Sequence, residues 1–187
     1  MQATITHLRM LKLMPLVLIC FVLAMGHGTS VAQTTSQPTN AAAPSDAQKM
    51  FANMKTLTGS WQGTIMNIKI DVTIRLTSSG TAILYEATTP GGGPPSHEIT
   101  MFYVEEARLL ATHYCDAGNR ARFEGKMSPE GKMSEFSFLD VAGSTRGGLV
   151  KRMMFTIIDA NKHVVELTFI RPDGKPIELR GEFERTK

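Results

Sequence analysis

The chain has 187 residues, a length that predicts one principal domain. Its 20 Lys and Arg residues against 17 Asp and Glu residues give a formal net charge of +3 at pH 7. The basic residues form no run, so the charge pattern argues against a nucleic-acid partner and against binding to an anionic membrane surface.

The first 32 residues have the organisation of a secretory signal peptide. Arg9 and Lys12 supply a basic start, residues 13–25 form an apolar stretch, and residues 30–32 offer a small-x-small cleavage pattern. The apolar stretch is shorter than the ~20 residues that span a bilayer, so a retained membrane anchor is the less favoured alternative. We therefore expect a secreted or periplasmic protein that has no membrane contact once the signal peptide (1–32) is removed.

Residues 33–44 are small, polar and interrupted by proline, which predicts a flexible leader before a domain that covers 45–187. The domain should begin with a helix, because Ser45 and Gln48 have the spacing of a capping box. Apolar residues then recur at helical spacing, namely Met50, Phe51, Met54 and Leu57. We expect this helix to stop at Gly59.

After the helix the hydrophobic period changes to two, which is typical of β-strands. The clearest strand covers 68–76, where five aliphatic residues alternate with polar ones. Further strand-like runs lie near 80–88, 97–105, 107–115, 120–126, 133–139, 149–158, 163–170 and 177–184. Turn signals rich in Gly, Pro, Asn and Asp separate these runs. The pattern predicts an all-β domain, a single antiparallel up-and-down β-barrel of about ten strands with one N-terminal helix, since closure removes exposed sheet edges.

The junction of the helix and the first strand carries Gly59-Ser60-Trp61. This motif resembles the G-x-W start of the calycin superfamily, which includes lipocalins and nitrobindin-like barrels. The resemblance implies that Trp61 plugs one end of the barrel. It also implies that a basic residue of the last strand, Arg180 or Arg185, covers the indole ring as a cation–π contact.

A second resemblance comes from residues 112–115 followed by Gly118-Asn119. These residues are similar to a group of uncharacterised exported bacterial proteins that have a lipocalin-like domain of unknown function. The chain lacks the disulfides of true lipocalins, and Cys115 is the only cysteine after the signal peptide. The resemblance therefore implies, in general terms, a small and partly apolar ligand inside the barrel.

The hairpin over 109–125 is the most informative segment for a binding site. We expect Cys115 opposite Arg120 and His113 opposite Arg122, so that these side chains and Glu124 share one face. The pattern alone favours a solvated surface with salt bridges. The alternative turns this face into the lumen, where Arg122 and His113 would bind a carboxylate or another anion. The candidate ligand-binding residues are Trp61, Met101, Tyr103, His113, Cys115, Arg122 and Glu124.

Other chemistry finds less support in the sequence. Cys115 and His113 lack an identifiable orienting group and oxyanion site, so no catalytic residue is predicted. His97, His113 and His163 are widely separated, which argues against a metal site. The nitrobindin resemblance implies an alternative function, haem binding with His163 as axial ligand, although a lone histidine on an apolar strand is more often a core residue. No other cofactor is expected, and the glycine-rich loop 89–96 predicts a mobile flap rather than a phosphate-binding loop.

Overall fold

A computed structural model describes residues 43–90 and 96–186, which belong to one compact unit, Ala41–Lys187. The signal peptide predicted over 1–32, most of the predicted leader and the centre of the glycine-rich loop lie outside the described residues. Those three expectations therefore stay predictions. Among the described residues, no helix is long and apolar enough to cross a membrane.

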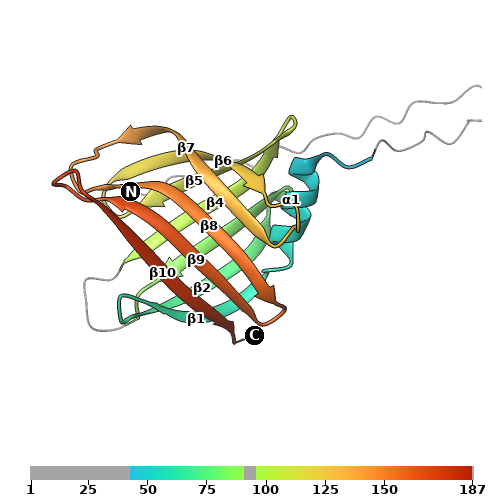
Figure 1. The fold of residues 1–187 in the computed structure, drawn as a ribbon, viewed down its shortest axis with the longest axis horizontal. Helices are drawn as coiled ribbons and strands as arrows, with labels where there is room; N and C mark the ends of the chain where they lie inside the picture. Colours follow the sequence, from blue (N-terminus) through green and yellow to red (C-terminus); the bar gives the residue numbers. More distant parts are fainter. Residues whose placement is uncertain (1–42, 91–95, 187) are drawn as a thin grey trace, which may run out of the picture. The chain divides into compact units, whose positions relative to one another are not determined.

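Ten antiparallel strands close into a barrel in which consecutive strands pair and β1 also pairs with β10 (Figure 1). The strands are β1 (Gly59–Ile65), β2 (Ile68–Thr77), β3 (Ala82–Thr88), β4 (His97–Glu105), β5 (Arg108–Cys115), β6 (Asn119–Met127), β7 (Met133–Gly143), β8 (Leu149–Asp159), β9 (Lys162–Ile170) and β10 (Pro176–Arg185). A short 3-10 turn, Ser78–Gly80, joins β2 to β3. The structure confirms the predicted up-and-down barrel and its single α-helix within the described residues.

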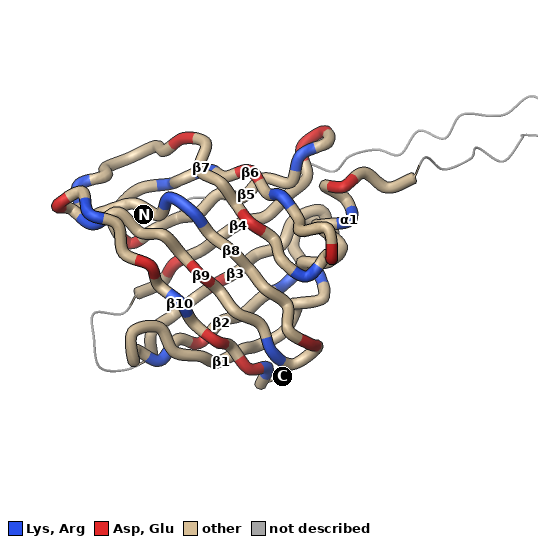
Figure 2. Tube along the Cα trace, viewed as in Figure 1, with Lys and Arg blue, Asp and Glu red and all other residues tan. Residues whose placement is uncertain are grey.

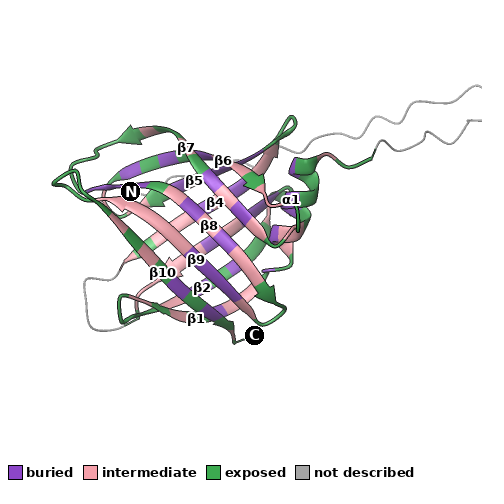
Figure 3. Ribbon diagram, viewed as in Figure 1, coloured by how far each residue is buried: buried purple, intermediate pink, exposed green. Residues whose placement is uncertain are grey.

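Alternation along parts of the strands separates the barrel interior from its outer surface. Buried positions alternate with exposed ones in β6 and β10 and with half-buried ones in β4 (Figure 3). Three rings fill the middle of the interior: Phe102, Phe136 and Phe155 have centroids 5.0 to 5.9 Å apart. Only the middle of the aliphatic stripe of β2 enters this core. Ile68 and Leu76, near the two ends of the strand, are 54% and 42% exposed.

The N-terminal helix, α1 (Asp46–Lys55), packs on β4, β5 and β6 (Figure 1). The predicted capping box is present: the backbone N–H of Gln48 donates to Ser45 Oγ, and the backbone N–H of Ser45 donates to Gln48 Oε1. Its apolar stripe is buried, and Met50 reaches so close to β6 that a Cβ at Gly125 would lie 2.7 Å from Met50 Cε. The helix ends before Gly59, which instead begins β1.

Charged residues of both signs are distributed along the strands rather than gathered by sign (Figure 2). Several of them pair across neighbouring strands, as Arg152 does with Glu135 and Lys162 with Glu182. Exposed pairs of this kind each contribute about 1 kcal/mol or less to folding stability. Residues of both signs are therefore interspersed along the described strands.

Candidate functional site

Trp61 closes one end of the barrel. Its side chain is buried, and its indole Nε1 donates to the Leu57 carbonyl at 2.7 Å. The Arg185 guanidinium lies 4.1 Å from the centroid of the indole ring and donates to the Thr58 carbonyl at 2.6 Å. The cation–π contact implied by the calycin resemblance is thus present and uses Arg185, whereas Arg180 pairs with carboxylates on the outer face.

His163 belongs to this closed end, where aromatic rings pack against it. It is fully buried, perpendicular to Trp61 at 4.3 Å between ring centroids and stacked on Phe183 at 5.2 Å. Neither ring nitrogen has a hydrogen-bond partner, and burial lowers the pKa of the imidazole to about 4. His163 therefore occupies the role of a neutral core residue.

This position does not fit haem ligation. An axial histidine must present a ring nitrogen to an open pocket, but His163 is enclosed by aromatic rings and does not line the barrel cavity. That cavity holds about 90 Å³, well below the ~300–1,000 Å³ typical of pockets for larger ligands. In the described arrangement, the residues near His163 could accept haem only after the closed end was rebuilt.

The cavity lies between the aromatic core and the opposite end of the barrel. Residues flanking the β1–β2 and β3–β4 connections contribute to its rim, including Ile70 and Thr88. One side is polar and consists of Tyr85, Glu98, Thr100 and His113. The other side is apolar and consists mainly of Met153, Phe155, Val165, Leu167 and Phe183. None of the described lining residues is Lys or Arg, so the cavity has one carboxylate and no fixed positive charge.

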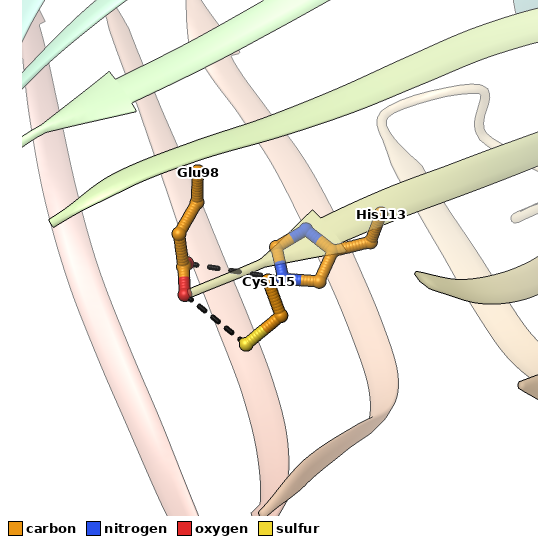
Figure 4. Close-up of side chains that lie close together, drawn as sticks. All are labelled: Glu98, His113 and Cys115. Carbon is orange, nitrogen blue, oxygen red and sulfur yellow. Dashed lines mark hydrogen bonds and ion pairs between the residues drawn. The ribbon is translucent and has the colours of Figure 1, made fainter. Parts of the chain in front are cut away.

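Four side chains of β4 and β5, which we call the polar wall, lie together: Glu98, Thr100 and His113 line this cavity, and Cys115 contacts Glu98 (Figure 4 shows Glu98, His113 and Cys115). Thr100 lies directly opposite His113 in the β4–β5 register, and its Oγ1 is 2.9 Å from His113 Nδ1. The Cys115 thiol donates to Glu98 Oε1 at 3.3 Å, while His113 Nε2 lies 3.8 Å from Glu98 Oε2. The buried His113 Nε2 has no hydrogen-bond partner.

Burial controls the protonation of the polar wall. It lowers the pKa of His113, and the carboxylates of Glu98 and Asp116 oppose this effect only in part. The imidazole is therefore neutral near pH 7, and its contact with Glu98 is not a full ion pair. Burial, with the adjacent Glu98 carboxylate, also raises the pKa of Cys115 to about 12. A thiol held in its protonated form is a poor nucleophile, so this arrangement does not resemble an activated Cys–His pair.

The pairing expected for the hairpin is wrong by one residue. His113 pairs with Ala121 and Cys115 with Asn119, because the connection Asp116–Gly118 has three residues and Gly118 adopts a φ of 84°. An odd loop length shifts the register by one position, and a shift of one residue turns a strand's side chains to the other face. His113 and Cys115 are consequently inside the barrel, while Arg122 and Glu124 are outside.

The remaining candidate residues also lie on the outer face of the sheet. Arg122 forms a bidentate pair with Asp140, and Glu124 forms one with Arg108 at 2.9 and 3.0 Å. Thr112 pairs with Arg122 across β5 and β6, and Met101 pairs with Thr112 across β4 and β5. Directly opposite residues share a face, so Met101 also points outward. Tyr103 reaches the same Thr112, with 3.4 Å between the two hydroxyl oxygens. The proposed lumenal anion site of His113 with Arg122 is therefore not assembled.

Sequence reasoning missed Glu98, Thr100 and Tyr85, which line the cavity together with His113. A period-two reading of 97–105 does contain a signal, because Glu98 and Thr100 share a face with the fully buried Phe102. A carboxylate on a core-facing position is unusual and marks a candidate site. That signal becomes convincing only once His113 is known to face the same interior.

Comparisons with known proteins support the fold. No protein-family model matches the chain, and no curated protein matches it. The crystal structure of Rv2717c from M. tuberculosis is similar, with a TM-score of 0.58 and 14% identity over 74% of this chain and 98% of that chain. A protein of unknown function from the DUF3598 family of Nostoc punctiforme aligns with a TM-score of only 0.20 and 8% identity, over 73% of this chain and 99% of that chain. At this level of identity, the likeness to Rv2717c shows a shared fold and nothing about ligands.

Proposed function

We propose that this chain is an exported binding protein whose barrel holds a small, mostly apolar molecule with one hydrogen-bond donor or cationic group. The observation that supports this proposal is the cavity itself, which is apolar on one side and polar on the other. Pockets that combine an apolar lining with a few convergent polar groups are the usual form of small-molecule sites. Export follows from the signal peptide predicted in the sequence.

The charge of the cavity selects the polar group of the ligand. Glu98 is the one carboxylate among the described lining residues and has no lysine or arginine beside it there. An ammonium or hydroxyl group can donate to this carboxylate, whereas a ligand carboxylate would be repelled by it. This preference is opposite to the one expected from a lumenal Arg122.

The volume of about 90 Å³ limits the part of the ligand that can be enclosed. An apolar cavity of about 150 Å³ binds benzene, so this cavity suits a branched or linear group of about four carbon atoms. The n-butylammonium ion has a suitable size and charge. Its affinity should be in the millimolar range, on the order of 1 mM, because so few atoms make contact.

The test is saturation-transfer NMR with n-butylamine and n-butyrate on the full chain in the presence of a chelator. We expect saturable binding of n-butylamine and none of n-butyrate. Glu98→Gln should weaken n-butylamine at least tenfold, since a hydrogen bond to a charged group contributes about 1.5–3 kcal/mol. Glu86→Gln is the matched control, because Glu86 is a β3 carboxylate that pairs with the exposed His97.

Equal binding of the amine and the carboxylate would contradict the proposal, as would equal affinities of the parent and Glu98→Gln. Loss of binding in Glu86→Gln as well would locate the amine on the outer surface. That result would remove the cavity from consideration.

A further inference from the structure

The polar wall contains three different metal-ligating atoms in close proximity. The Glu98 carboxylate, His113 Nε2 and Cys115 Sγ all lie within 4.8 Å of one another (Figure 4). They come from two adjacent strands, so the backbone hydrogen bonds of the β4–β5 ladder fix their spacing. No other such group of three occurs among the residues that the structure describes.

From this geometry we infer that Glu98, His113 and Cys115 form a site for Zn²⁺ or a similar divalent transition-metal ion. The inference is independent of the proposed organic ligand, because it requires only these three side chains. Zinc takes nitrogen, sulfur and carboxylate oxygen ligands, and sites with three protein ligands leave a fourth position for water or another molecule. Here the fourth position would face the cavity.

The distances between ligand atoms are compatible with tetrahedral coordination. Bonds of roughly 2.0–2.3 Å place neighbouring ligand atoms of a tetrahedron roughly 3.3–3.8 Å apart. Cys115 Sγ is 3.3 Å from one oxygen of Glu98, and His113 Nε2 is 3.8 Å from the other. Modest side-chain rotation would bring the third pair of atoms, sulfur and nitrogen, to the same spacing.

His113 provides an independent observation that points to a ligand. Its Nε2 is buried, has no hydrogen-bond partner and points toward the other two ligand atoms. The opposite nitrogen, Nδ1, contacts Thr100 Oγ1 at 2.9 Å. When Nδ1 carries the proton and donates to this hydroxyl, Nε2 keeps its lone pair for a metal, which is the usual outer contact of a metal-ligating histidine.

Metal binding at these residues must release one proton. The Cys115 thiol loses its hydrogen, its sulfur forms a bond to the metal, and the hydrogen bond to Glu98 is broken. Zn²⁺ is then balanced by one thiolate and one carboxylate, while the imidazole stays neutral. The metal brings two positive charges and one proton leaves, so the charge of the site changes from −1 to zero, and affinity increases with pH.

The test is titration of the full chain with Co²⁺, which reports thiolate ligation as a charge-transfer band in the near-ultraviolet. We expect one equivalent to bind and one equivalent of Zn²⁺ to displace it. Cys115→Ser should abolish the charge-transfer band, and His113→Gln and Glu98→Gln should each weaken binding at least tenfold. His97→Gln is the matched control because it removes an exposed histidine of β4 that pairs with Glu86 and lies outside the ligating group, and its spectrum should equal that of the parent.

A second measurement uses the unaltered chain. Zn²⁺ should slow alkylation of Cys115 and release one proton per metal bound, which a pH indicator detects. Unfolding midpoints of all variants in a chelator identify any variant that fails to fold.

The absence of a saturable band in the folded parent would overturn the metal site, as would a band that persists in Cys115→Ser. The n-butylamine experiment is performed in a chelator, so a failed metal site leaves its result unchanged. Conversely, failure of n-butylamine to bind leaves the Co²⁺ titration fully informative.

Discussion

The barrel contains two buried histidines, one at each end of its interior, and their surroundings differ. His163 is enclosed by Trp61 and Phe183 at the closed end, whereas His113 faces Glu98 and the cavity at the polar wall. Burial lowers the pKa of both imidazoles, so protonation does not distinguish them. The difference lies in what faces the ring nitrogens. Aromatic carbon surrounds His163 and leaves no place for a ligand. His113 instead faces a carboxylate, a thiol and the cavity.

The two ends also differ in how they are stabilised. At the closed end, Arg185 covers Trp61 and donates to backbone carbonyls of the helix–strand connection and of the β8–β9 turn. At the polar wall, the contacts are few and one buried nitrogen has no partner. We therefore expect substitutions at the closed end to change stability and substitutions at the polar wall to change binding.

The largest expected effect is that of Trp61→Ala. The indole is 1% exposed, and its removal leaves a cavity at the closed end, so the free energy of unfolding should fall by about 3–5 kcal/mol. Urea unfolding followed by circular dichroism measures the change. An unchanged unfolding midpoint would mean that Trp61 does not stabilise the closed end of the barrel.

The next effect is a pH dependence that comes from His163. Its pKa is about 4 in the folded state and near 6.5 in the unfolded chain, so protons bind the unfolded state first as the pH falls. The stability present above pH 6.5 should therefore decrease by roughly 2–3 kcal/mol by pH 4.5. His163→Leu should remove this part of the slope, while His97→Gln, at an exposed histidine, should retain it. Equal slopes in the parent and His163→Leu would contradict the assignment.

Arg185→Lys tests the guanidinium at the closed end and should have an intermediate effect. Lysine keeps the charge but cannot reach several carbonyls and the indole face together, so we expect a loss of about 1–2 kcal/mol. Arg180→Lys is the matched control on the same strand, since Arg180 makes only exposed ion pairs. Thermal unfolding of the two variants should differ, and equal midpoints would show that the fork geometry of Arg185 is unimportant.

Most of the fold could be predicted because its signals are local. Each strand carries its own period of two, Ser45 and Gln48 mark the helix start, and Gly59 with Trp61 marks the first strand. The strand register could not be predicted across Asp116–Gly118, because two- and three-residue turns have similar sequences and opposite consequences for the facing residues.

The candidate site was predicted only in part for the same reason. His113 and Cys115 were identified as a pair, and they do lie together inside the barrel. Glu98 was missed, because a carboxylate in a strand is usually solvated and no local pattern shows which partner it meets. The cavity depends on the summed volumes of side chains from many strands, which no single segment of sequence specifies.

The smallest expected effect is that of Arg122→Ala, and it separates the outer face from the lumen. The pair of Arg122 with Asp140 is about half exposed on both sides, so its loss should cost at most ~1 kcal/mol of stability. Affinity for n-butylamine and for Co²⁺ should be unchanged, because neither the cavity lining nor the ligating group includes Arg122. Glu98→Gln provides the opposite pattern, with weakened binding of both probes. If Arg122→Ala instead abolished binding while its unfolding midpoint stayed within error, the guanidinium would have to face the lumen, and the β5–β6 register described above would be wrong.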